Sequence, residues 1–312
     1  MTPHQLETAI KEKASALGLD ACGVARATRL NSDVAFFTGW IDKGYHGTMS
    51  YMARHLEKRV DPRLLLADAK SVIVVAQNYF PSEQQPPGTT FRISRYAYGT
   101  DYHVVLKDKL HLLAGEIARM AGDHKYRVFT DSAPVLERSW AEEAGLGRCG
   151  KNGCLSIPRK GSYFFLGELI TTIDIQSGKP FTKDLCGKCT RCMDACPTKA
   201  IIKPGIIDAN KCISYLTIEL KGPVPRKYRN QCHGWIFGCD ICQEVCPHNT
   251  HAHPHKEPRF KALPYVTSWT DDDWSTLPEE SYEQYIVGTG SPIARIRFEK
   301  LADNISCAAE KP

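Results

Sequence analysis

The sequence has no long apolar segment and no strong excess of one charge. No hydrophobic run approaches the roughly 20 residues that a membrane-spanning helix needs. The N-terminus is polar and carries an acid at Glu7, which is not the pattern of a signal peptide. The 40 basic and 35 acidic residues leave a net charge of +5, which permits a polyanionic partner without requiring one. We therefore expect a cytoplasmic protein without membrane contact.

Fingerprints of the common nucleotide-binding folds are also missing. No G-x-G-x-x-G follows an expected strand, so the Rossmann signature for nicotinamide or flavin binding is absent. The Walker phosphate loop is absent as well. Any redox cofactor or substrate must therefore be held by a different arrangement.

The expected elements before residue 175 alternate between helix and strand. Apolar residues at helical spacing, such as Leu106, Leu110 and Leu113, indicate helices, and β-branched runs indicate strands. The expected helices cover residues 4–17 and 104–120 and begin again near Pro134, and the expected strands cover 21–25, 71–77, 126–130 and 163–175. This order indicates an α/β layer, and 312 residues leave room for a second, smaller domain.

Cysteine is concentrated in one stretch of the chain. The run Cys186, Cys189, Cys192, Cys196-Pro matches C-x2-C-x2-C-x3-C-P, the pattern of bacterial-type ferredoxins. A second copy follows with its first cysteine displaced upstream, at Cys212, Cys239, Cys242 and Cys246-Pro. This duplicated motif is the one internal repeat that we find.

The spacing predicts how the cysteines share two 4Fe–4S clusters. Three thiolates in a tight loop can bind three corners of one cubane, and the fourth, before proline, reaches the other cubane. The first cluster is then held by Cys186, Cys189, Cys192 and Cys246, and the second by Cys196, Cys212, Cys239 and Cys242. Structural zinc also uses C-x2-C pairs, but the two x3-C-P endings favour iron–sulfur clusters. A disulfide framework is disfavoured because the chain is long and has no secretory signal.

Several other features allow more than one interpretation. Asp131 ends an expected strand, where it could donate a proton or cap the following helix. The histidine-rich segment 248–255 could bind a metal, but a solvated loop is favoured. Residues 221–229 are basic and could bind phosphate or form a solvated charged face. Cys22 fits a core position, whereas Cys149, Cys154, Cys232 and Cys307 have no assigned role.

The sequence resembles the epoxyqueuosine reductases, cobalamin-dependent enzymes that complete queuosine in tRNA. The resemblance runs through most of the chain to about residue 250 and rests on short blocks that occur in order. These are E-K-R-V at 57–60, R-Y-A-Y-G-T-D-Y-H at 95–103, T-D-S at 130–132, A-E-E-A-G-L-G at 141–147, K-N at 151–152, G-S-Y at 161–163 and C-I-S-Y-L-T at 212–217. The ferredoxin motif alone occurs in many proteins, whereas the ordered set is specific.

The resemblance implies a two-part fold. A nitroreductase-like, cobalamin-binding domain of the α+β or α/β class would cover residues 1–175. A bacterial-type ferredoxin domain with two 4Fe–4S clusters would cover 176–250, and a C-terminal loop with short helices would cover 251–312. Longer members carry helical repeats at the C-terminus, and here we expect at most a reduced form within residues 271–312.

The implied reaction removes the epoxide oxygen of epoxyqueuosine, at the wobble position of the tRNA anticodon, as water. It requires two electrons and two protons. Low-potential clusters can drive cob(II)alamin toward cob(I)alamin, while the protein supplies orientation and protons. The partners would be tRNA carrying epoxyqueuosine and an unidentified electron donor, and we expect a monomer.

The resemblance also assigns residues. Asp131 would donate the proton, which requires burial to raise its pKa above the usual value near 4. Lys221 matches a tRNA-contact position. The positions that match cobalamin contacts are Arg59, Ser94, Asp131, Ser156, Leu166, Ser214, Cys239 and Asp240.

Two other functions share some of these features. A corrinoid-dependent reductive dehalogenase combines cobalamin with a ferredoxin part, but such proteins usually carry a twin-arginine export signal, which residues 1–30 lack. An electron-transfer subunit would use the clusters but bind no corrinoid. Visible absorption after addition of cobalamin separates this last function from the other two.

Overall fold

The structure is a computed structural model that describes residues 1–310. Its central sheet has the strand order β1-β2-β7-β4, and all three strand pairs are antiparallel. The strands are β1 (Ala21–Arg26), β2 (Ser71–Asn78), β7 (Phe164–Thr171) and β4 (Tyr126–Phe129). The α/β layer predicted from the alternating elements is therefore wrong in strand direction, and the sheet belongs to the α+β class. Alternation along the chain fixes the order of elements but not the sense in which strands pair.

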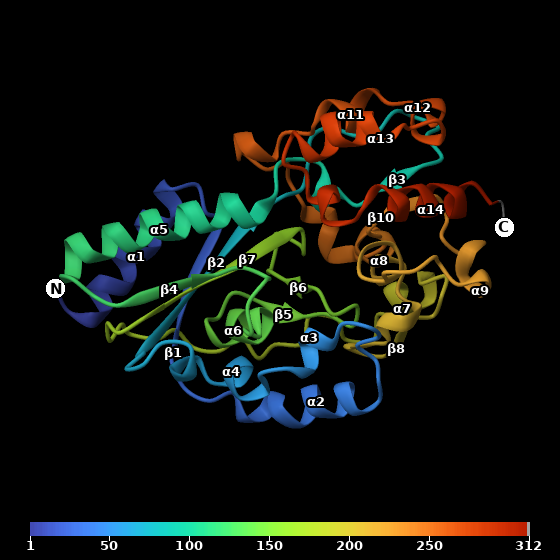
Figure 1. Cartoon of the computed structure of the whole chain (residues 1–312). Coiled ribbons are helices and arrows are strands. Elements are labelled where there is room, and N and C mark those ends of the chain that lie inside the picture. The colour runs from blue at the N-terminus through green and yellow to red at the C-terminus, as the bar shows by residue number, and fades with distance from the viewer. Residues whose placement is uncertain (311–312) are drawn as a thin grey trace.

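Helices cover both faces of this sheet (Figure 1). On one face, α1 (Pro3–Ala16) and α5 (Tyr102–Ala121) pack on Ile73 and Val75 of β2. On the other face, α6 (Glu137–Glu143) packs through Trp140 on Val72 and Val74. Since successive strand residues point to opposite faces, β2 is buried along both and needs an uninterrupted apolar run.

Shorter elements complete this first half of the chain. They are α2 (Asn31–Asp42), α3 (Ser50–Ala53), α4 (Leu56–Val60), η1 (Pro62–Leu64), β3 (Arg92–Ile93), η2 (Arg95–Ala97), β5 (Arg148–Cys149) and β6 (Leu155–Ser156). The predicted helices at 4–17 and 104–120 and the predicted strands are present with small shifts at their ends. The helix predicted near Pro134 begins later, at Glu137.

The cysteine-rich half consists of small elements that present the thiols on tight turns. These elements are α7 (Arg191–Ala195), β8 (Ile201–Lys203), β9 (Ile206–Ile207), η3 (Ala209–Lys211), α8 (Ile213–Ile218), α9 (Arg226–Arg229), β10 (Trp235–Phe237), α10 (Ile241–Glu244) and η4 (Pro247–His251). Strand β10 pairs in parallel with β3, which joins the two halves of the chain.

The C-terminal residues form the short helices that we expected. Their bounds are η5 (Pro258–Phe260), α11 (Pro264–Ser268), α12 (Asp271–Ser275), α13 (Glu279–Tyr282), the π-helical η6 (Glu283–Val287), η7 (Pro292–Arg295) and α14 (Phe298–Ala309). They share one hydrophobic cluster with Phe91 and Ile93 of the first half and with Ile236 and Phe237 of β10. This core crosses the domain boundaries predicted at residues 175 and 250, which remain a prediction.

In the histidine-rich segment 248–255, His251 and His253 are exposed, as in the solvated loop that we predicted, whereas His248 and His255 contact the rest of the chain. The Nε2 atom of His248 lies 2.8 Å from the Leu185 carbonyl oxygen, and the His255 ring packs edge-on against Phe260. Within residues 1–310, no three His, Cys, Asp or Glu side chains converge in the way that a single metal ion needs.

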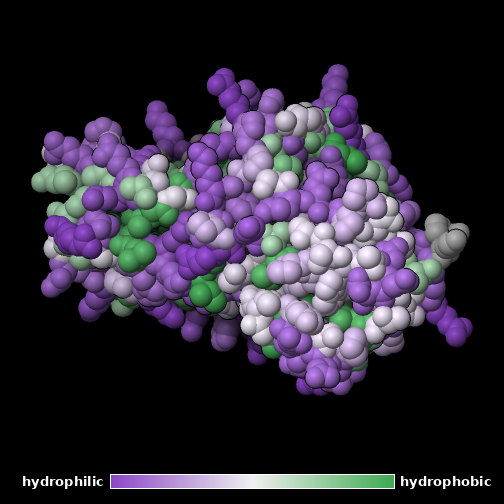
Figure 2. All heavy atoms as spheres, turned by 90° about the horizontal axis from the view of Figure 1, so that it is seen from above, coloured by the Kyte–Doolittle hydropathy of each residue, from purple (hydrophilic) through white to green (hydrophobic). Residues whose placement is uncertain are grey.

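The surface seen in Figure 2 is mainly polar, with small and separate hydrophobic patches. Val104 and Leu112 of α5 are among the exposed apolar residues. No helix in the described part of the chain is both long and apolar enough to cross a membrane.

Candidate functional site

Asp131 lies directly after the end of β4 in a constrained backbone conformation. Its φ of 53° is in the left-handed region, which non-glycine residues rarely adopt. Beside it, the Thr130 hydroxyl donates a hydrogen bond of 2.8 Å to the Leu166 carbonyl on β7. The N-cap of α6 is Leu136, not Asp131, so the alternative that Asp131 caps this helix is wrong.

Three donors surround one carboxylate oxygen of Asp131. Its Oδ2 accepts a hydrogen bond of 2.9 Å from the Tyr102 hydroxyl and lies 3.3 Å from His103 Nε2. Arg295 Nη1, from the C-terminal η7, lies 3.6 Å from the same oxygen. The Asp131 side chain is 45% exposed, so this polar group opens to the surface of the molecule.

The surroundings favour the charged form of Asp131. Burial by itself raises the pKa of Asp131, but the hydrogen bonds from His103 and Tyr102 outweigh it, and the net shift is downward. The raised pKa that we expected for a proton donor is therefore wrong. Sequence could not show this, because the donors come from distant segments.

The proton in this group belongs to His103. Its Nδ1 lies 2.7 Å from Asp101 Oδ1, so the imidazole sits between two carboxylates. Burial lowers the pKa of His103, but the hydrogen bonds to Asp101 and Asp131 outweigh it and raise the pKa to about 9. At neutral pH the ring is thus an imidazolium beside the Asp131 carboxylate.

Two further carboxyl groups, Glu137 and Glu168, lie near the Asp131 loop. The Asp131 backbone N–H donates a hydrogen bond to Glu137 Oε1, from the first turn of α6. Glu168 on β7 is fully buried, and neither of its oxygens has a partner in residues 1–310. Burial, followed by the Asp131 charge, raises the pKa of Glu137 to about 8, and burial also raises the pKa of Glu168 well above its usual value. Both acids therefore carry their protons at neutral pH.

Replacing Glu137 is expected to release the Asp131 loop. Glu137→Ala removes the acceptor of the Asp131 N–H, so this amide should exchange with deuterium faster in peptides spanning residues 130–136. Glu137→Gln keeps a side-chain oxygen acceptor and should preserve the protection. Mass-detected hydrogen exchange checks both variants. Glu143→Ala on the same helix is the matched control, and equal protection in Glu137→Ala and the wild type would contradict the contact.

The predicted cobalamin-contact residues fall into two neighbourhoods. In the first, Asp240 is buried and accepts hydrogen bonds from the Ser94 hydroxyl and, at 2.8 Å, from the Arg95 backbone N–H. Burial raises the pKa of Asp240. A side chain at Gly238 would meet the Ser94 Cβ at 2.5 Å, so this turn needs glycine. Asp240 directly follows Cys239, which is a predicted cluster ligand. Ser214 lies two residues after Cys212, which is another.

The other predicted contacts are Leu166, Arg59 and Ser156. Leu166 is bonded to Thr130 through its carbonyl oxygen. Arg59 is buried and donates hydrogen bonds to the backbone oxygens of Tyr51 at 2.7 Å and Arg54 at 3.2 Å. Ser156 is also buried, and its hydroxyl has no partner within the described residues. An orphaned hydroxyl is the kind of group that a bound, amide-rich cofactor can satisfy.

The predicted assignment of eight cysteines to two clusters stays a prediction, but charge effects link members of each set. The charges of Cys186 and Cys246 act on Cys192, where they add to the rise in pKa caused by burial. Burial and the charges of Cys212 and Cys196 raise the pKa of Cys239 in the same way. Each of these thiols is thus affected by members of its own predicted set. Thiols that hinder one another's ionisation become stable thiolates when they bind metal.

The remaining cysteines are close to these groups but are not needed by the pattern. Cys154 forms a hydrogen bond with Cys242, which places a fifth thiol beside the second set. The sulfurs of Cys232 and Cys307 lie 3.0 Å apart in a buried cluster that joins α14 to the cysteine-rich half. Their roles remain unassigned.

The basic segment 221–229 is only partly available to a ligand. Lys221, Arg226 and Lys227 are exposed. Arg229, however, forms ion pairs with Asp303 at 3.1 Å and Glu310 at 2.6 Å, which docks it on α14. The prediction that Arg229 forms part of a phosphate-binding edge is therefore wrong.

Sequence reasoning missed four side chains of the Asp131 group. Tyr102 stands in the aromatic block at 95–103, where nothing in the pattern indicated a contact with Asp131. Glu137 and Glu168 gave no signal beyond an acid at the start of a helix and an acid inside an apolar strand. Arg295 comes from the C-terminal region, so no spacing rule could connect it with Asp131.

Comparison with known proteins agrees with this arrangement. Residues 59–132 match the family model described as "Epoxyqueuosine reductase QueG, DUF1730", and residues 185–249 match the "4Fe-4S double cluster binding domain". The epoxyqueuosine reductase of Cellulophaga algicola is 44% identical over 296 residues, which covers 95% of each chain. That of Cyclobacterium marinum is 45% identical and covers 95% of this chain and 94% of the relative. This chain belongs to the epoxyqueuosine reductase family.

Solved structures of epoxyqueuosine reductases have the same fold. A complex of one such enzyme with an epoxyqueuosine-modified tRNA-Tyr stem loop is 32% identical, with a TM-score of 0.89 over 98% of this chain and 81% of that chain. The Bacillus subtilis epoxyqueuosine reductase, 32% identical and with a TM-score of 0.88, is described with its catalytic aspartate loop swung out of the active site. It covers 98% of this chain and 82% of that one. Family membership sets aside the dehalogenase and electron-carrier alternatives.

Proposed function

We propose that this chain reduces epoxyqueuosine to queuosine in tRNA. The observation that carries the proposal is the Asp131–His103 pair, which presents a carboxylate and a protonated imidazole in an exposed position. The family of the chain supplies the substrate class, and a relative was solved with a modified tRNA stem loop. The reaction consumes two electrons and two protons, breaks both C–O bonds of the epoxide, and yields an alkene and water.

The cofactors are two 4Fe–4S clusters, held by the cysteine-rich part, and cobalamin, held by a first part with a nitroreductase-like fold. The cysteine groups described above would hold the clusters. Arg59, Ser156 and Leu166 would lie near the corrin on the Asp131 side, and Ser94, Ser214, Cys239 and Asp240 would lie between the corrin and the second cluster. Cobalamin supplies a strongly reducing metal centre for the carbon–oxygen bond. The corrin would then be bound by residues 1–175. Electrons would be carried by residues 176–250, and the site would be completed by residues 251–312.

The residues of this chain would manage the protons. As the epoxide opens, negative charge grows on its oxygen, and Asp131 relays to that oxygen a proton that comes from His103. His103 returns a proton to Asp131, because its Nε2 lies 3.3 Å from Oδ2. The lowered pKa of Asp131 is then no obstacle, since the imidazolium and the carboxylate act as one acid. Tyr102 holds the carboxylate in place through its hydroxyl.

Asp101→Asn is expected to lower the pH above which turnover is lost. In the wild type, burial and the two carboxylates set the pKa of His103 at about 9, so the imidazolium is lost as pH rises through 9. The asparagine keeps a hydrogen-bond acceptor but removes the charge that favours the imidazolium, so the alkaline limb of the kcat–pH profile should shift downward. An unchanged limb would exclude His103 as the proton source.

The tRNA contacts remain proposals. Lys221 is exposed and would bind phosphate, and Arg226 and Lys227 could extend that contact. We propose that the chain acts as a monomer and takes electrons from a separate donor.

Mass analysis of tRNA nucleosides tests the function in the cell. Cells without this protein should accumulate a nucleoside one oxygen heavier than queuosine, and the wild-type gene should restore queuosine. Normal queuosine in the deletion strain, with no other reductase gene in the genome, would refute the proposal.

A further inference from the structure

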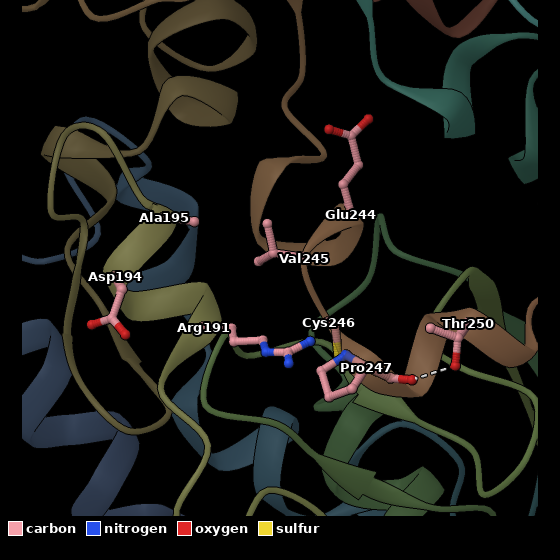
Figure 3. Close-up of a pocket in the computed structure, with 8 residues that line it drawn as sticks. All are labelled: Arg191, Asp194, Ala195, Glu244, Val245, Cys246, Pro247 and Thr250. Atoms are coloured by element: carbon pink, nitrogen blue, oxygen red, sulfur yellow. Dashed lines mark hydrogen bonds between the residues drawn. The ribbon is translucent and has the colours of Figure 1, made fainter.

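A surface hollow of about 620 Å³ lies against one predicted ligand of the first cluster. It is bounded by α7, the end of α10 and the start of η4, and Cys246 is part of its lining. Figure 3 shows the Arg191 side chain reaching from α7 toward Cys246 and Pro247. The first cluster is therefore approached from outside at this point.

The second predicted cluster site lies beside a buried polar group. Its predicted ligand Cys239 is joined to Asp240, which is buried under Ser94 and Arg95. The two cysteine sets thus differ in position: one borders an open hollow, and the other lies against the predicted corrin contacts. Electrons that arrive from outside would enter at the first set and leave from the second.

We infer that the hollow and the loop of residues 183–199 form the docking surface for an acidic, low-potential, one-electron carrier protein. The inference rests on the proposed function, which needs two electrons that the chain itself does not supply. In each encounter the reduced carrier gives one electron to the first cluster and leaves oxidised, so two encounters supply one turnover.

The charges around the hollow favour an acidic partner. The loop has two acidic residues and four basic ones, which are Lys183, Lys188, Arg191 and Lys199. Both acids are engaged within the loop: Asp184 accepts hydrogen bonds from the backbone N–H groups of Cys186 and Gly187, and Asp194 accepts from the Thr190 hydroxyl.

The other acid that lines the hollow is offset by two arginines. Glu244 forms ion pairs with Arg92 at 3.0 Å and Arg95 at 2.8 Å. Lys188 and Arg191 are exposed and remain to face a partner. Opposite charges across such a rim accelerate association and make it dependent on salt.

Charge reversal at the rim tests the surface. The double variant Lys188→Glu/Arg191→Glu, with both clusters loaded, is titrated at low salt with plant-type [2Fe–2S] ferredoxin, an acidic carrier. We expect Kd to rise about tenfold or more and bleaching of the cluster absorbance by reduced ferredoxin to slow by a similar factor. Reduction by dithionite, a small reductant that needs no docking surface, should be unchanged. Lys125→Glu, an exposed reversal before β4 at the opposite end of the molecule, is the control (Figure 1).

Three results would overturn the inference. The first is an unchanged Kd for ferredoxin in the double variant. The second is an equal weakening of ferredoxin binding in Lys125→Glu. The third is an equal slowing of cluster reduction by dithionite in the double variant. Failure of the proposed function looks different: ferredoxin would still reduce the clusters of the wild type, but epoxyqueuosine in tRNA would stay unchanged.

Discussion

Asp131→Asn should abolish turnover while leaving the cofactors bound. The amide has the size of the carboxyl group and can still accept the Tyr102 hydroxyl, but it cannot take a proton from His103 and pass it on. Positioned acids contribute about 10²–10⁴-fold to rate, so kcat should fall by at least about 100-fold. The measurement is single-turnover conversion of epoxyqueuosine in a stem-loop RNA, with iron content and corrin absorbance recorded on the same samples.

The matched control is Asp123→Asn, which removes the charge of an exposed aspartate in the turn before β4. It should keep wild-type activity. If Asp131→Asn also keeps it, Asp131 has no part in the chemistry. If Asp131→Asn loses iron or corrin along with activity, the residue supports the fold rather than the proton transfer.

Cys192→Ala should remove one cluster and leave the other. Cys192 lies with Cys186 and Cys246, so three ligands remain for the first cubane. Iron and sulfide should therefore fall to about half of the wild-type content. Turnover with a protein electron donor should be lost, because the first cluster is the expected point of entry.

Cys22→Ala is the control for the cysteine change. Cys22 lies on β1, beside the apolar cluster under α1, and burial raises its pKa to about 12, so it is an unreactive thiol. Its removal should leave the iron content unchanged. Full iron content in Cys192→Ala would reject the assignment of this cysteine to a cluster.

Local patterns predicted most of the scaffold. The helical spacing of Leu106, Leu110 and Leu113 predicted α5, and the β-branched run predicted β2. Each pattern of apolar residues fits one regular backbone conformation. The antiparallel sheet was not predicted, since pairing sense depends on how connections cross the sheet. The late start of α6 also follows from tertiary contacts, because Asp131 is held in the left-handed conformation by Glu137.

The candidate site, too, was predicted only in part from local patterns. Spacing before proline grouped the cysteines, and the pKa values of Cys192 and Cys239 are each affected by the charges of cysteines in their own predicted group. The electrostatics of Asp131 could not be predicted, because they depend on Tyr102 and His103 at the start of α5 and on Arg295 near the C-terminus, two segments far from Asp131 in the sequence. The sequence pointed to an acid that burial would protonate. The structure instead offers a carboxylate with an imidazolium beside it, which changes the predicted pH dependence.

One reaction tests the central claim most directly. Purified protein with both clusters and cobalamin is incubated without oxygen with dithionite, methyl viologen and a stem-loop RNA that carries epoxyqueuosine. Mass spectrometry should find the modified nucleoside converted to queuosine, lighter by one oxygen atom, and no conversion in Asp131→Asn. An unchanged nucleoside, or a product that keeps the oxygen as a hydroxyl group, would contradict the reductive removal of the epoxide oxygen.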